Sequence, residues 1–149
     1  MAEGTVQSIE ISAPAGVIYG IAADLAAYPD WAQGVRSVEI LEEDADGMPV
    51  RAAFVVDGMT KRIGYELVYT HDAPNRMSWT AIPGDDISEM EGSYDLTPLD
   101  DETTSVYYML RVSTSFTIPG FLRRQAEKQI VMAALRGLKK QAEAAAKSA

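Results

Sequence analysis

The contrast between the middle of this chain and its end restricts the fold more than any other feature. Residues 35–114 contain strand-like segments separated by short turn clusters, and the stretch after Pro119 is nearly thirty residues long, proline-free and rich in Ala, Leu, Lys, Arg, Gln and Glu. Alternating apolar and polar side chains are typical of strands with one buried face, and the final composition favours one long helix. An α+β fold is therefore expected.

Two strands show the alternation most clearly. Their apolar positions are Ile63, Tyr65, Leu67 and Tyr69 in one, and Met90, Gly92, Tyr94 and Leu96 in the other. Turn clusters at 42–47, 57–58, 72–75, 83–86 and 98–102 divide the region into six strands. Because these connections are too short for crossover helices, the sheet is predicted to be antiparallel.

The residues before this region predict a first strand and a short helix. β-Branched residues over 5–12 indicate the strand, and Val17, Ile18, Ile21 and Leu25 recur at helical spacing. The segment 28–31, with sequence YPDW, is predicted to be a turn carrying two aromatic side chains.

In the long helix, one apolar stripe is predicted to lie on the sheet. Its members are Leu122, Ala126, Ile130, Ala133, Ala134 and Leu138.

Composition and charge exclude several classes of protein. Hydrophobic residues make up 47% of the 149 residues and charged residues 23%, as in ordinary globular proteins, and there is no cysteine. The net charge of −9 disfavours nucleic-acid binding, although the residues from Pro119 onward carry +5 and the first 118 carry −14. The start of the chain lacks the pattern of a signal peptide, and no apolar run is long enough to span a bilayer. We expect a cytoplasmic protein with one domain over residues 1–149.

The whole chain resembles the START-like helix-grip superfamily (SRPBCC), and within it the actinobacterial branch of the polyketide cyclase/dehydrase and lipid-transport family. The resemblance lies in residues 9–14 (IEISAP), 28–31 (YPDW), 96–98 (LTP), 119–120 (PG) and 138–140 (LKK). It implies a curved antiparallel sheet of about seven strands wrapped around a long C-terminal helix, with short helices after the first strand. None of these motifs is catalytic.

A sheet curved around one helix with small residues on its stripe leaves space for a ligand. We therefore predict an apolar cavity between sheet and C-terminal helix, with tyrosine hydroxyls as its polar groups. The predicted lining residues are Trp31, Phe54, Val56, Ile63, Tyr65, Leu67, Tyr69, Met77, Trp79, Met90, Tyr94, Val106, Tyr108, Leu110, Phe121, Leu122 and Ile130. Tyr28, Phe116 and Ile118 are candidates for its mouth, together with Trp31 and Phe121. The alternative is that these side chains simply fill a core.

The sequence offers little for catalysis. His71 is the only histidine and is predicted to be a solvated residue at a strand end, and serine-hydrolase and glycine-rich phosphate motifs are absent. Alternation places Arg51, Arg62, Arg111, Glu66 and Glu89 on the outer face, which leaves tyrosines inside. We therefore predict no catalytic residue, metal or cofactor.

Three functional hypotheses follow. The first is binding, transport or sensing of a lipid or other small hydrophobic molecule. The second, from the family resemblance, is a polyketide cyclase or dehydratase that uses the same cavity. The third is a protein-interaction domain with a collapsed cavity. In addition, Phe116, Ile118, Phe121 and Leu122, followed by Arg123 and Arg124, predict a possible transient contact with an anionic membrane surface.

Overall fold

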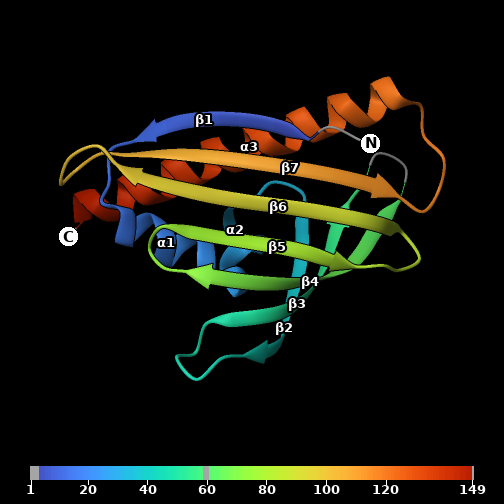
Figure 1. Ribbon diagram of the computed structural model, residues 1–149, viewed down its shortest axis with the longest axis horizontal. Coiled ribbons are helices and arrows are strands. Elements are labelled where there is room, and N and C mark those ends of the chain that lie inside the picture. The colour runs from blue at the N-terminus through green and yellow to red at the C-terminus, as the bar shows by residue number, and fades with distance from the viewer. Residues whose placement is uncertain (1–3, 59–60, 149) are drawn as a thin grey trace.

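One curved antiparallel sheet organises the protein. The structure is a computed structural model and describes residues 4–58 and 61–148. The sheet order is β1-β7-β6-β5-β4-β3-β2 (Figure 1). The strands are β1 Thr5–Ile11, β2 Val35–Glu43, β3 Pro49–Asp57, β4 Arg62–Asp72, β5 Arg76–Ile82, β6 Ile87–Pro98 and β7 Thr104–Thr114. The predicted first strand, the six following strands and their antiparallel pairing are confirmed.

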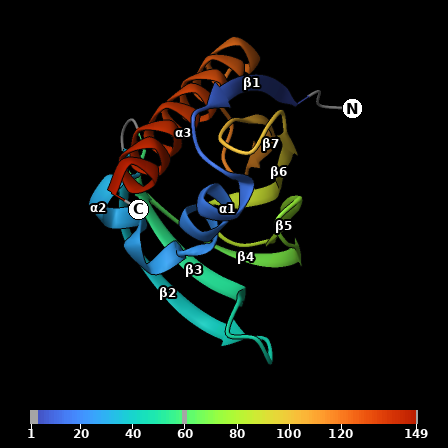
Figure 2. The same ribbon diagram turned by 90° about the vertical axis from the view of Figure 1, so that its left-hand side faces the viewer.

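Helices occupy the concave side of this sheet. They are α1 Ala15–Ala23, the 3-10 turn η1 Leu25–Ala27, α2 Tyr28–Trp31 and α3 Gly120–Ser148. Figure 2 shows the sheet curling from β1, which runs beside α3, round to β2, with α1 inside the curve. The prediction of a turn at residues 28–31 is wrong, because this segment forms α2. Pro29 falls in the first helical turn, where its missing N–H has no intrahelical partner to lose.

The inward side of α3 differs from the predicted stripe. Its buried residues are Glu127, Val131, Leu135, Leu138 and Ala142. The prediction is wrong at Ile130, which is 50% exposed, whereas the adjacent Val131 is fully buried. Since one residue corresponds to about 100° around a helix, the true inward face is rotated from the predicted one by roughly that angle.

A buried carboxylate explains how the helix is seated. Glu127 is 2% exposed, and its carboxylate accepts hydrogen bonds from the backbone N–H of Val112 (2.8 Å) and the hydroxyl of Thr5 (3.2 Å). These two residues belong to β7 and β1, so one side chain joins α3 to both strands.

Two further contacts hold α3 along the end of β1. Lys139 Nζ donates to the carbonyl oxygen of Glu10 (2.9 Å), and the backbone N–H of Ser12 donates to the carboxylate of Glu143 (2.9 Å). Lys139 and Glu143 are themselves 2.9 Å apart, one helical turn from each other. Consequently α3 is attached along the length of β1.

Candidate functional site

Aromatic side chains gather on the concave face of the sheet because strand register aligns their alternating positions. Tyr69 of β4 pairs with Trp79 of β5, and Tyr94 of β6 pairs with Tyr108 of β7. The ring centroids of Trp79 lie 5.9 Å from Tyr69, 5.5 Å from Tyr94 and 5.7 Å from Tyr108, and those of Tyr94 and Tyr108 are 4.5 Å apart. These tilted and edge-to-face arrangements are those that aromatic quadrupoles favour.

The aromatic cluster continues to the first helices. Phe54 and Tyr65 stack with their centroids 5.4 Å apart and an interplanar angle of 10°. Tyr28 of α2 lies 6.3 Å from Phe54 and 5.1 Å from Trp31, and its hydroxyl donates to the carbonyl of Ala22. The aromatic lining therefore extends from β7 across the sheet to α2.

A glycine makes room for the central indole. Gly92 of β6 is the register partner of Trp79, and a Cβ atom at Gly92 would overlap the six-membered ring of that indole. This close approach requires glycine, because any other residue would push the ring away from the sheet. The position of Trp79 is thus determined by a missing side chain.

Four tyrosine hydroxyls at the centre have no hydrogen-bond partner among the described residues: those of Tyr65, Tyr69, Tyr94 and Tyr108. The one buried side-chain nitrogen or oxygen in the described part that is both unpaired and sealed from solvent is Nε of Arg51. The four hydroxyls are therefore not sealed, and each borders space that a water-sized group can reach. We call the region bordered by Tyr28 and these four residues the tyrosine chamber.

Burial determines the ionisation of the tyrosine chamber. It raises the pKa of each of the five tyrosines well above 10, and for four of them neighbouring charges, chiefly those of other tyrosines in the group, raise it further. At neutral pH all five are uncharged phenols that can donate and accept hydrogen bonds.

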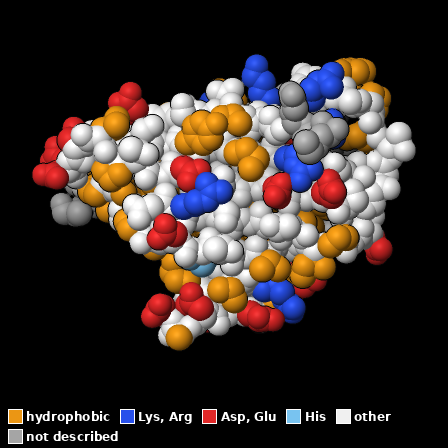
Figure 3. Space-filling model, in the orientation of Figure 1, with side chains coloured by type: hydrophobic (Ala, Val, Ile, Leu, Met, Phe, Trp, Pro, Cys, Tyr) orange, Lys and Arg blue, Asp and Glu red, His pale blue; other side chains and the backbone are white. Residues whose placement is uncertain are grey.

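Most charged side chains lie outside the tyrosine chamber. Among the described residues, Glu127 is the one charged residue that is buried, and its carboxylate is bonded at the β1–β7 edge. On the outer face of the sheet, Arg111 pairs with Glu89 (3.1 Å) and Glu91 (2.6 Å). Figure 3 shows this face, where basic and acidic side chains lie next to one another between scattered apolar groups.

The predicted lining residues fall into three groups. Those buried on the concave face are Phe54, Leu67, Tyr69, Met77, Trp79, Met90, Tyr94, Val106, Tyr108 and Leu110. Those half-buried are Trp31, Val56, Ile63, Tyr65 and Leu122. Phe121 and Ile130 are corrections, because they are 63% and 50% exposed and do not belong to the buried wall.

His71 is also a correction. It lies within β4, half-buried, two residues from Tyr69 and on the same side of the strand. Its Nε2 is 2.6 Å from the carbonyl oxygen of Pro49 and its Nδ1 is 2.7 Å from the hydroxyl of Tyr19. A carbonyl only accepts, so Nε2 carries the proton of the bond to Pro49.

Tyr19, which the sequence did not single out, thus ties α1 to the sheet. Its hydroxyl also lies 3.2 Å from the carbonyl of Arg76. Burial, and secondly the charge of Asp72, raises the pKa of Tyr19 to about 12. Both ring nitrogens of His71 thus have hydrogen-bond partners, and this pair positions α1 on the sheet. The period-two spacing of Tyr69 and His71 is the signal that could have placed His71 inside.

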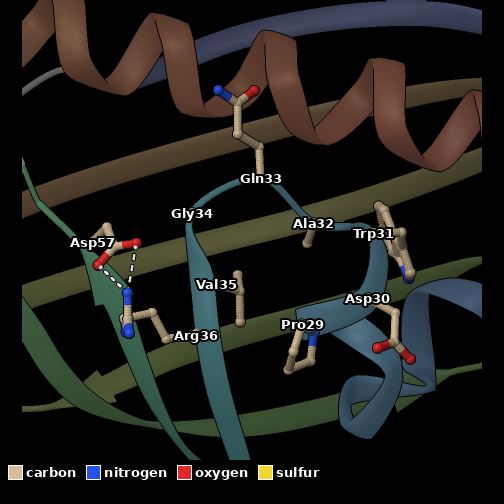
Figure 4. Close-up of a pocket in the computed structure, with 9 residues that line it drawn as sticks. All are labelled: Pro29, Asp30, Trp31, Ala32, Gln33, Gly34, Val35, Arg36 and Asp57. Atoms are coloured by element: carbon tan, nitrogen blue, oxygen red, sulfur yellow. Dashed lines mark hydrogen bonds and ion pairs between the residues drawn. The ribbon is translucent and has the colours of Figure 1, made fainter.

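A groove lies beside the turn between α2 and β2. Its volume is about 460 Å³, and it is bordered by residues 29–36 and Asp57. Figure 4 shows the Arg36–Asp57 ion pair at one end of the groove, Trp31 at the other, and Gln33 extending toward α3. This groove lies outside the tyrosine chamber, since none of the chamber tyrosines borders it.

The described part of the chain has neither a metal-binding cluster nor a membrane-spanning helix. No three His, Asp or Glu side chains there come together in a group that could hold a metal ion. No helix there has the length and apolar character needed to cross a bilayer.

Comparison with known proteins identifies both a family and a fold. Residues 4–143 match the family described as "Polyketide cyclase / dehydrase and lipid transport". No curated protein sequence matches.

Among solved structures, the chain is similar to a START superfamily protein from Mycobacterium smegmatis, with 21% identity, a TM-score of 0.86 and coverage of 95% of this chain and 97% of the other. It is also similar to the Zhui aromatase/cyclase from Streptomyces sp. R1128, with 19% identity, a TM-score of 0.82 and coverage of 96% and 94%. A third similar structure, from Thermus thermophilus, is 23% identical, with a TM-score of 0.78 and coverage of 95% and 98%. These similarities confirm the START-like fold.

Proposed function

Since the chain belongs to the polyketide cyclase/dehydrase and lipid-transport family, we propose that it binds a small, uncharged, mainly hydrophobic molecule in the tyrosine chamber. The observation that carries this proposal is the set of unpaired hydroxyls of Tyr65, Tyr69, Tyr94 and Tyr108, which border accessible space within an apolar wall. A ligand oxygen placed in this space would accept or donate a hydrogen bond at these hydroxyls in place of water.

The chamber favours a particular kind of ligand. Aromatic faces around Trp79 suit a flat or branched apolar body, and neutral phenols suit carbonyl and hydroxyl oxygens. A carboxylate or ammonium group would lose its hydration without gaining an opposite charge, because the buried charge of Glu127 is bonded at the sheet edge. The proposed ligand is therefore neutral, with a few oxygen atoms.

A cyclase or dehydratase activity is the second candidate, and the similarity to the Streptomyces aromatase/cyclase favours it. For such an activity, the tyrosine chamber would have to transfer protons to or from the bound substrate as well as bind it. Phenols whose pKa lies well above 10 are poor bases at neutral pH, although they stabilise a developing oxyanion by donating hydrogen bonds. The chamber thus supports binding more directly than proton abstraction.

The test removes single hydroxyls. Tyr65→Phe and Tyr108→Phe each delete a group that makes no hydrogen bond within the described protein, so thermal stability should stay the same or rise, and affinity should fall. A hydrogen bond to a ligand is worth about 0.5–1.5 kcal/mol, or roughly 2- to 12-fold in Kd. Tyr19→Phe is the matched control: it loses the hydroxyl that contacts His71 and the Arg76 carbonyl, so it should lower stability and leave affinity unchanged.

The ligand for this test comes from native mass spectrometry. The protein purified from its own host is analysed intact, and compounds released by solvent are then identified and titrated. A stoichiometric neutral compound whose affinity falls in Tyr65→Phe and Tyr108→Phe supports the proposal. An empty protein that binds no apolar fluorescent probe contradicts it and favours a protein-interaction domain. Turnover of the bound compound would instead establish the cyclase or dehydratase activity.

A further inference from the structure

Ile130 is half exposed, yet it projects from the side of α3 that faces α2. Ile130 and Gly137 are seven residues apart, which places them within about 20° of each other around the helix. Gly137 packs on Trp31, since a Cβ there would lie 3.0 Å from Cε3 of the indole. Ile130 therefore lies on the Trp31 side of α3, about 10 Å closer to the start of the helix.

The groove beside the α2–β2 turn lies along this side of the helix. It extends from Trp31, which contacts α3, to Asp57 at the end of β3 (Figure 4). Thr5, at the start of β1, is bonded to Glu127, so the beginning of α3 lies at the end of the sheet where β1 starts and β3 ends. Val35, which borders the groove, also packs against the hydrophobic core. The groove therefore adjoins the hydrophobic core at Val35.

The concave face of β3 and β4 is less deeply buried at the end of the sheet near Asp57. Along the concave face of β3, Phe54 is 4% exposed and the next inward residue, Val56, is half-buried. Along β4, Leu67 is 3% exposed, whereas Tyr65 is half-buried. Tyr65 is part of the tyrosine chamber, so this is the end at which the chamber wall is open.

From these positions we infer that ligands reach the tyrosine chamber through the gap between α3 and the α2–β2 turn, passing beneath Ile130. This inference rests on the proposed function. The contact between Trp31 and Gly137 closes the gap on one side, because the absent side chain lets helix and indole touch. The opposite side of α3 is fixed to β1 through Lys139 and Glu143. The free aliphatic side chain of Ile130 then borders the opening that remains.

The absence of cysteine makes a direct test possible. Ile130→Cys introduces a single thiol that can be modified with a bulky maleimide, which would obstruct the gap without altering the chamber. Phe121→Cys is the matched control. It is 63% exposed, and being nine residues from Ile130 it lies on the opposite side of the same helix. Binding of the neutral fluorophore N-phenyl-1-naphthylamine is then followed by stopped-flow fluorescence.

We expect the labelled I130C protein to bind and release the fluorophore at least about tenfold more slowly than the unlabelled protein, with Kd unchanged within about twofold. Labelled F121C should behave like the unmodified chain. Equal rates in both labelled proteins would overturn the inferred route, as would a weaker Kd with an unchanged association rate. If the unmodified protein binds no fluorophore at all, the proposed function fails, and the inference with it.

Discussion

Replacing Glu127 tests how α3 is held on the sheet. Glu127→Ala removes the acceptor of the Val112 N–H and of the Thr5 hydroxyl, and Val112 is itself buried. Leaving a buried N–H unpaired costs about 1–3 kcal/mol, and the truncated side chain adds a packing loss of about 1 kcal/mol. We expect the free energy of unfolding to fall by about 2–4 kcal/mol, or roughly 5–15 °C in Tm for a chain of this length.

Urea unfolding followed by circular dichroism measures this loss, and two further variants separate its causes. Glu127→Gln keeps an acceptor for Val112 and can donate its amide N–H to Thr5, so it should remain within about 1 kcal/mol of the parent protein. Glu143→Ala, at a half-exposed position of the same helix, should cost less than about 1 kcal/mol. If Glu127→Ala costs less than about 0.5 kcal/mol, or Glu127→Gln costs as much as Glu127→Ala, the proposed attachment is wrong.

Three other predictions concern the chamber and the surface. Burial raises the pKa of the five chamber tyrosines above that in the unfolded chain, so the stability they contribute is complete below pH 10. Above pH 10 the free energy of unfolding should fall by about 1.4 kcal/mol per pH unit for each tyrosine. Urea unfolding at several alkaline pH values checks this, and phenolate absorbance that rises without loss of structure would contradict it. Gly92→Ala should destabilise by about 1–3 kcal/mol by displacing the indole, and the effect should disappear in a Trp79→Ala background; an equal cost in both backgrounds would refute the overlap. If the protein contacts membranes, it should float with vesicles rich in phosphatidylglycerol at low salt. Phe121→Asp should abolish this flotation, and Leu99→Asp, at a second exposed apolar residue, should not. Flotation unaffected by Phe121→Asp would rule the contact out.

The sheet was predictable because alternation in a strand translates directly into two faces. Once Tyr65, Leu67 and Tyr69 are assigned to one face, strand register places them opposite the partners that the structure shows, such as Trp79. The buried positions of β4, β5 and β7 follow the same rule, whereas β6 departs from it at Ser93 and at the register shift between Ile87 and Glu89. The prediction that His71 is solvated is wrong because the inward alternation of β4 does not end at Tyr69 but continues for one more position, to His71.

Two apolar stripes lie side by side on α3, so hydrophobicity alone does not choose between them. Val131, Leu135, Leu138 and Ala142 form the buried stripe, and Ala126, Ile130 and Ala133 form the neighbouring one. Glu127 points inward to reach the backbone of Val112, and the apolar Ile130 is turned toward the side. A pattern that ranks side chains by apolar character places these two residues the other way round. The unpaired hydroxyls were equally hidden, since Tyr94 and Tyr108 come from different strands and their partners depend on how the strands meet.

The attachment of α3 has an evolutionary consequence. Glu127 binds the N–H of Val112, Lys139 binds the carbonyl of Glu10, and Glu143 binds the N–H of Ser12. These three contacts use main-chain atoms, which nearly every amino acid provides, and only the bond from the Thr5 hydroxyl to Glu127 depends on a particular side chain. Substitutions in the strands can therefore accumulate beneath the helix without releasing it, and the interior can be relined while the frame persists.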